Sequence, residues 1–136
     1  LELQAGLYGI REKDRITDTI LKLVSLEEQA ESYARALSGG MKRRLLVAKA
    51  MVHQPPIIIL DEPTAGVSPI VMDELFDRII DVAKSGISIL MVEQNARQAL
   101  EIAHKGFVLV QGRNAFSGSG KDLLADKEVR KSFLGG

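Results

Sequence analysis

Several residue types that carry chemistry in other proteins are absent or rare in this sequence of 136 residues. There is no cysteine, which excludes a disulfide framework, a cysteine–zinc site and a cysteine nucleophile. The only histidines are His53 and His104, so a multi-histidine metal site is not expected. No apolar run approaches the roughly 18 to 20 residues that span a bilayer. The formal net charge is zero, which gives no reason to expect nucleic acid as a partner.

A phosphate-binding loop of the form Gly-x-x-x-x-Gly-Lys-Ser/Thr is also missing. The nearest text is Ser-Gly-Ser-Gly-Lys-Asp at residues 117–122, but Ala115 stands where the first glycine is required. Asp122 stands where a hydroxyl would meet Mg²⁺, and an anion beside phosphates is repelled. This stretch is therefore expected to be a turn into a helix. The sequence shows no secretory signal and begins with Leu1 rather than methionine, so we expect it to start inside a longer chain.

The front third of the sequence reads as helices. Apolar residues at helical spacing predict a helix over residues 15–24, and Ser25 with Glu28 has the pattern of a capping box that starts a short second helix. A long helix should follow Ser38 and end at Pro55-Pro56.

The remainder alternates between strands and helices, which predicts an α/β fold with a mostly parallel sheet flanked by helices. Strands are expected at 57–60 and 87–92, and a hairpin around Gly112. The intervening helices should begin at Ser68-Pro69 and at Asn95, and residues 121–134 should be helical again. We expect three segments, namely part of a helical subdomain over 1–54, an α/β core over 55–118 and a helical tail over 119–136.

Two adjacent acids follow the apolar run Ile57–Leu60, which has the composition of a strand buried on both faces. Asp61 and Glu62 should therefore lie at the carboxyl end of this strand, where open α/β sheets bind ligands. This is the Walker B pattern, in which the first acid holds Mg²⁺, usually through water, and the second polarises an attacking water. The alternative is a strand that ends in a solvated acidic turn.

The segment Leu37–Met41, Leu-Ser-Gly-Gly-Met, opens the long helix. Free amides at a helix N-terminus suit a phosphate, although a plain serine cap explains the same residues. The basic residues that follow are interpreted as a solvated helix face rather than a nucleic-acid patch, because no aromatic residue is interleaved with them. They are Lys42, Arg43, Arg44 and Lys49.

Together the two motifs resemble those of ATP-binding-cassette (ABC) transporter ATPases, a family with the P-loop NTPase fold, here in part. The resemblance makes Ser38, Gly39, Gly40 and Met41 the signature motif, with methionine where glutamine is common. Asp61 matches the Mg²⁺-binding Walker B aspartate and Glu62 the catalytic glutamate. Ala65, Gly66, Val67 and Ser68 lie where the D-loop belongs, with Ser68 in place of the usual aspartate. Gln94 occupies the position of the switch histidine.

The resemblance implies a function and partners. Two such subunits sandwich ATP and Mg²⁺ head to tail, as a homodimer or heterodimer, and the signature motif of one subunit faces the ATP of the other. They work with transmembrane permease subunits at the cytoplasmic face of the inner (plasma) membrane, with no nucleic acid involved. The text from Asp61 onward resembles branched-chain amino acid importers, whereas the front half resembles drug and polysaccharide exporters.

Two other readings stay open at this point. In the first, the chain is an incomplete, catalytically inert fragment or interaction module. In the second, it is part of a non-transport ABC ATPase that acts in translation or DNA repair.

Overall fold

The computed structural model describes residues 1–134 and divides the chain into two compact units, Leu1–Val92 and Glu93–Gly136. Each unit has its own elements and is described by itself. These units do not coincide with the three segments expected from the sequence, which refer to the parts of a complete ABC cassette and stay a prediction.

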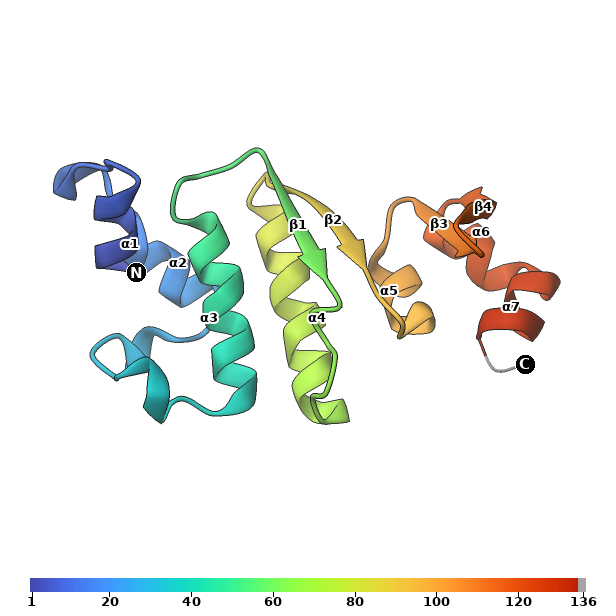
Figure 1. The fold of residues 1–136 in the computed structure, drawn as a ribbon, viewed down its shortest axis with the longest axis horizontal. Helices are drawn as coiled ribbons and strands as arrows, with labels where there is room; N and C mark the ends of the chain where they lie inside the picture. Colours follow the sequence, from blue (N-terminus) through green and yellow to red (C-terminus); the bar gives the residue numbers. More distant parts are fainter. Residues whose placement is uncertain (135–136) are drawn as a thin grey trace. The chain divides into compact units, whose positions relative to one another are not determined.

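The first unit is helical over its front half and α/β over the remainder (Figure 1). Its elements are α1 (Glu2–Leu7), η1 (Glu12–Asp14), α2 (Thr17–Leu23), η2 (Glu27–Gln29), η3 (Ala34–Ala36), α3 (Gly39–Met51), β1 (Ile57–Asp61), α4 (Pro69–Lys84) and β2 (Ser88–Val92). Helices α3 and α4 stand side by side, and β1 and β2 run alongside them (Figure 1).

Strands β1 and β2 are parallel, as the sequence predicts, with Ile57 opposite Ser88 and Asp61 opposite Val92. Helix α4 makes the crossover between them, and it starts with Pro69 in its first turn. Its buried stripe is Leu75, Phe76, Ile79 and Val82. The helix stops just before Gly86, whose φ of 97° lies in the left-handed region that glycine adopts most readily.

The expectation that β1 is buried on both faces is wrong for this chain. Ile58 and Leu60 are buried, but Ile57 is 58% exposed and Ile59 is 69% exposed. Helices cover one face of the strand, and among the described residues β1 pairs only with β2. Ile57 and Ile59 therefore belong to an uncovered apolar face.

The capping box expected at Ser25 does not form. Ser25 has a φ of 52°, and its hydroxyl accepts a hydrogen bond from Arg78 Nη1 at 3.2 Å. The short 3-10 turn η2 begins after Leu26 with no side-chain cap. A tertiary contact with α4 thus takes the serine that the local pattern assigned to a cap.

The second unit contains an antiparallel hairpin and three short helices. They are α5 (Ala96–Ile102), β3 (Gly106–Val110), β4 (Arg113–Gly118), α6 (Gly120–Ala125) and α7 (Lys127–Phe133). The predicted hairpin at Gly112 is confirmed: Gln111 and Gly112 have φ values of 49° and 75°, the positive pair that two-residue hairpin turns require.

The single helix expected over 121–134 is instead two helices. Asp126 separates them, because its carboxylate accepts hydrogen bonds from the amides of Glu128 and Val129 at 2.8 and 2.9 Å and so caps α7. The core of this unit is Leu100, Leu123 and Val129.

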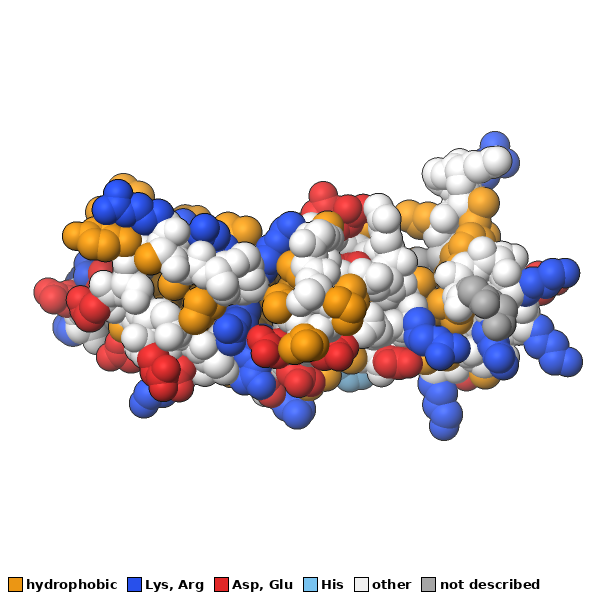
Figure 2. Space-filling view, turned by 90° about the horizontal axis from the view of Figure 1, so that it is seen from below, with side chains coloured by type: hydrophobic (Ala, Val, Ile, Leu, Met, Phe, Trp, Pro, Cys, Tyr) orange, Lys and Arg blue, Asp and Glu red, His pale blue; other side chains and the backbone are white. Residues whose placement is uncertain are grey.

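The surface carries both charges. Acidic, basic and apolar side chains lie interspersed on the face that Figure 2 shows, in keeping with equal numbers of the two charges in the sequence.

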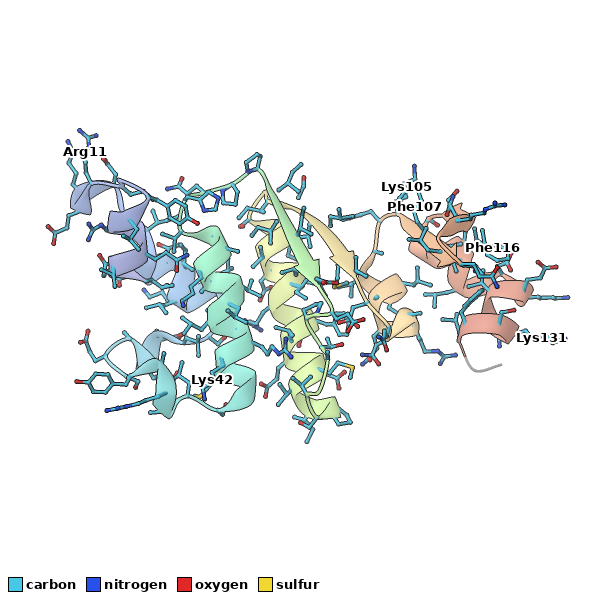
Figure 3. All side chains as sticks on the ribbon, in the orientation of Figure 1. Arg11, Lys42, Lys105, Phe107, Phe116 and Lys131 are labelled. Carbon is cyan, nitrogen blue, oxygen red and sulfur yellow. The ribbon has the colours of Figure 1, made fainter. Side chains whose placement is uncertain are left out.

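In the second unit Lys105 lies over the ring of exposed Phe107, with Nζ 5.2 Å from the ring centroid (Figure 3).

Candidate functional site

The carboxyl end of β1 presents two adjacent acids in different backbone conformations. Asp61 is the last residue of the strand and is exposed. The amide of Glu62 extends the ladder by donating to the Val92 carbonyl at 2.8 Å, yet Glu62 has a φ of 44°. A non-glycine residue in this left-handed region costs on the order of 1 kcal/mol, and such residues cluster at functional sites. The turn at Glu62 directs the two side chains differently.

Helices α3 and α4 both begin at one edge of the unit, and the loop that follows β1 runs down to that edge, whereas β1 itself ends part-way along the two helices (Figure 1). Ser38 is the N-cap of α3, and its Oγ accepts a hydrogen bond from the Met41 amide at 3.2 Å. The first amides of a helix have no partner within the helix, and a Cβ added at Gly39 would meet nothing within 4 Å. This end of α3 is therefore open to an anion.

Gly40 has a different environment from Gly39. A Cβ at Gly40 would lie 2.7 Å from Cγ1 of Val71, in the first turn of α4. The absence of a side chain at Gly40 is what lets the N-terminal turns of α3 and α4 approach each other.

The loop between β1 and α4 contains the residues expected to form a D-loop. The Ala65 amide donates to the Glu62 carbonyl at 3.0 Å, and the Val67 amide donates to that of Thr64 at 3.4 Å. Gly66 has a φ of 70°, which glycine tolerates without strain. Ser68 is the N-cap residue of α4, but its side chain makes no capping hydrogen bond.

Two of the four basic residues of α3 do not form a solvated face, which corrects the sequence interpretation. Arg43 Nη2 donates to the Ala65 carbonyl at 2.8 Å. Arg44 Nη1 donates to the carbonyls of Val24 and Ser25 at 3.4 and 3.2 Å. Lys42 and Lys49 are exposed, as expected.

Arg43 is the site residue that sequence reasoning missed. Its position offered a signal, since it lies one helical turn before Val47, which is buried on the same face of α3. Arg43 also lines an open hollow of about 200 Å³ together with Asp61 and Pro63.

Gln94 belongs to the second unit, two residues after the end of β2 along the chain. It is exposed, and its carbonyl accepts a hydrogen bond from the Ala96 amide at 2.8 Å. The neighbouring Asn95 donates its amide to the Glu93 carboxylate at 3.3 Å, so local hydrogen bonds shape this turn.

The acids fit a Mg²⁺ ion that is shared with a phosphate ligand. Within residues 1–134, no three His, Asp or Glu side chains are grouped as a complete metal cage. Mg²⁺ typically keeps several waters and takes only one or two protein carboxylates beside substrate phosphates. An exposed Asp61 next to the hollow suits that kind of binding.

Residues 117–122 form a turn into a helix, as expected. Strand β4 ends at Gly118, and the Ser119 hydroxyl accepts a hydrogen bond from the Asp122 amide at 3.0 Å. A Cβ at Gly120 would lie 2.1 Å from the Leu100 carbonyl oxygen, so the absence of a side chain at Gly120 allows close packing there.

Among the described residues, no helix is both long and apolar enough to cross a membrane.

Comparison with known proteins agrees with this geometry. The sequence model of the family described as "ABC transporter" matches residues 2–65, which include the N-terminus of α3 and both acids. The chain belongs to the ABC transporter family. It is 37% identical over 120 residues to BraG of Pseudomonas aeruginosa, a high-affinity branched-chain amino acid transport ATP-binding protein, covering 88% of this chain and 52% of BraG.

An exporter ATP-binding protein and a solved cassette structure are similar as well. The lipopolysaccharide export ATP-binding protein LptB of Escherichia coli is 30% identical, covering 99% of this chain and 56% of LptB. The structure of cbiO1 from Clostridium perfringens, part of the ABC transporter complex cbiONQ, is 32% identical with a TM-score of 0.77, covering 87% of this chain and 48% of cbiO1. The chain is thus a partial α/β ABC ATPase domain, and it spans about half the length of the relatives it matches.

Proposed function

We propose that this chain is the C-terminal part of an ABC transporter ATPase subunit that binds and hydrolyses ATP to drive solute transport across a membrane. One observation carries the proposal: the acids at the end of β1 and the open N-terminus of α3 belong to a single unit, in which Arg43 of α3 donates to Ala65 in the loop that follows the acids. A magnesium-binding end and a phosphate-binding end are the two features that this chemistry needs.

Each site residue has a proposed role in phosphoryl transfer to water, in which catalysis is mainly positioning and charge neutralisation. Asp61 holds Mg²⁺ through water, and Glu62 accepts a proton from the attacking water. Gln94 orients that water by hydrogen bonding. Ser38, Gly39, Gly40 and Met41 present helix amides to the ATP of a partner subunit. The proposed D-loop links the chain's own ATP site to the segment that meets the partner's ATP. It consists of Ala65, Gly66, Val67 and Ser68.

The proposed partners are a second ABC ATPase subunit, in a homodimer or heterodimer, and transmembrane permease subunits. The assembly would place this chain on the cytoplasmic face of the inner membrane. No nucleic acid has a part in this function.

Branched-chain amino acid import is the transport we propose. The similarity to BraG supports it, as do the residues from Asp61 onward, including Gln94, which is usual in one of those subunits. The similarity to LptB favours a second candidate, export, in agreement with the exporter-like front half.

The first experiment reads the gene upstream of Leu1 and expresses the complete open reading frame with its neighbouring permease genes. A Gly-x-x-x-x-Gly-Lys-Ser/Thr motif in that frame and Mg²⁺-dependent ATPase activity abolished by Glu62→Gln are expected. Uptake of leucine, isoleucine or valine into vesicles then distinguishes import from export of a lipopolysaccharide. A reading frame that truly begins at Leu1, with no activity in any permease complex, would favour the inert interaction module instead.

A further inference from the structure

One guanidinium group connects two segments that are far apart in the sequence. Arg43, in the second turn of α3, donates from Nη2 to the carbonyl oxygen of Ala65 at 2.8 Å, across 22 residues of sequence. The Arg43 side chain is half-buried and lies on the face of α3 that continues to buried Val47. A charged donor makes a hydrogen bond about twice as strong as a neutral one.

The acceptor lies in the loop between β1 and α4. Residues 62–68 include no helix or strand, and two turn bonds lie within them: the Ala65 amide donates to the Glu62 carbonyl at 3.0 Å, and the Val67 amide donates to the Thr64 carbonyl at 3.4 Å. The far end of the loop is also fixed to α3, because Val71 at the start of α4 packs directly on Gly40. Helix α3 thus holds the loop at Ala65 and just beyond its end.

We propose that Arg43 is a positioning residue that ties the segment Ser38–Met41 to the loop Asp61–Ser68 within one subunit. This inference rests on the proposed function, in which the first segment meets a partner's ATP and the loop serves the chain's own site. Because the Arg43–Ala65 bond makes the two segments move together, the state of one ATP site is passed to the other. Loss of Arg43 should therefore uncouple the sites rather than prevent nucleotide binding.

The neighbouring residue supplies a matched control. Lys42 has the same charge on the same helix, is exposed, and lies on the side of α3 turned away from α4 (Figure 3). Arg43→Met removes the donor to Ala65 and the charge, Lys42→Met removes an equal charge elsewhere on the helix, and Arg43→Lys keeps the charge on one donor nitrogen and should give partial rescue.

The link itself is tested by amide hydrogen exchange on the complete subunit. In Arg43→Met the amides of Ala65 and Val67 should exchange about tenfold to a hundredfold faster, the worth of one hydrogen bond from a charged donor. Arg43→Lys should recover part of that protection, and Lys42→Met should match the parent. If Arg43→Met does not fold, Arg43→Gln, with its shorter amide donor, takes its place with the same expected direction. Equal exchange in the Arg43 and Lys42 variants would overturn the proposal.

The functional consequence is measured in the complete subunit with its permease. Arg43→Met should lower kcat about tenfold with little change in KM, and the Hill coefficient for ATP should fall toward one. A parent without ATPase activity would contradict the proposed function, while the exchange data would still decide the link. An active parent in which Arg43→Met equals Lys42→Met in kcat, KM and Hill coefficient would contradict the coupling.

Discussion

At the scale of single residues, the adjacent carboxylates Asp61 and Glu62 differ in backbone conformation, in keeping with the different roles that we propose for them. Asp61 keeps strand geometry and ends opposite Val92, whereas Glu62 turns into the left-handed region while its amide still extends the ladder. Because the two backbone conformations differ, the effect of substituting Asp61 is not expected to match the effect of substituting Glu62.

The first prediction separates these two acids in the complete subunit. Glu62→Gln should bind ATP as the parent does, but turnover should fall by about 10² to 10⁴, the usual worth of a general base, because a neutral amide cannot take a proton from water. Asp61→Asn should instead raise the Mg²⁺ concentration needed for half-maximal activity. Steady-state rates across a Mg²⁺ titration measure both effects. Identical Mg²⁺ dependence in both variants and the parent would refute the division of roles.

Gln94 carries a second prediction at this scale. Glutamine can donate a hydrogen bond but cannot carry positive charge near neutral pH. The turnover rate should therefore show no titration with a pKa near ~6.5, the ordinary pKa of histidine. Gln94→Ala should lose one hydrogen bond to a charged group, about 1.5–3 kcal/mol, or one to two decades in rate. Gln94→His should be tolerated. An unchanged rate in Gln94→Ala would mean that this position has no catalytic role and that the partner's site does the hydrolysis.

Glu2 provides a prediction about stability and pH. Hydrogen bonds from Thr17 and then from Arg15, whose Nη1 lies 2.8 Å from Glu2 Oε2, hold the pKa of this carboxyl below its usual range. A lowered folded-state pKa stabilises the fold above the unfolded value, and that stability is lost as the pH falls through the folded value. The effect should be small, because the carboxylate is largely exposed and water screens the pair.

The test of Glu2 compares urea unfolding of the parent and Glu2→Gln from neutral to acidic pH. The variant should be less stable at neutral pH, and the difference should vanish once the parent's carboxylate is protonated. In a Thr17→Val background, which keeps the shape and removes the main donor, the same substitution should cost less. A difference that does not depend on pH would show that Glu2 acts by packing alone.

At the scale of elements, the close approach of α3 and α4 can be tested through two neighbouring glycines. Gly40→Ala places a Cβ 2.7 Å from Val71 Cγ1, and overpacking of this kind costs about 1–3 kcal/mol, partly offset by better helix propensity. A net loss of about 1 kcal/mol is expected from the urea midpoint. Gly39→Ala, which meets no atom within 4 Å, is the control and should be neutral or stabilising.

A second substitution checks the cause of that loss. Val71→Ala removes the methyl groups that Gly40→Ala would meet, so the double variant should be more stable than the sum of the two single variants predicts. Additive losses of stability would mean that the contact between Gly40 and Val71 does not determine how stably the first turns of α3 and α4 pack.

The elements also show what a sequence can and cannot predict. Local patterns predict the parallel strand pair, the crossover helix and the hairpin at Gly112. Apolar runs, the Ser-Pro pair and glycine favour a backbone conformation within a few residues of their own position. The failed cap at Ser25 and the misassigned Arg43 have one cause: each side chain contacts a partner far along the chain, Arg78 in the first case and Ala65 in the second. Such contacts depend on the packing of helices, which no local pattern contains. The placement of the signature, Walker B and D-loop residues came from family resemblance, and their roles stay predictions.

At the scale of the whole molecule, the uncovered face of the parallel pair is the dominant feature. Four apolar side chains point outward from adjacent strands in the first unit: Ile57, Ile59, Leu90 and Val92. Patches of this kind on soluble proteins mark surfaces that are covered by another partner or that cause association. The chain spans about half of its relatives, and in the complete subunit that we propose the additional part would cover this face.

The last prediction follows from that face: the isolated 136-residue chain should self-associate and melt at low temperature, and it should not hydrolyse ATP. Ile59→Lys puts a charge at the most exposed apolar residue of β1 without changing its buried residues, so it should shift the chain toward monomer in sedimentation velocity. Ile70→Lys is the control, because Ile70 is an exposed isoleucine as well but lies in the first turn of α4 rather than on a strand. A parent that is monomeric and melts cooperatively at high temperature would show that the chain closes its own core, and equal effects of the two lysines would show that net charge, not the strand face, controls association.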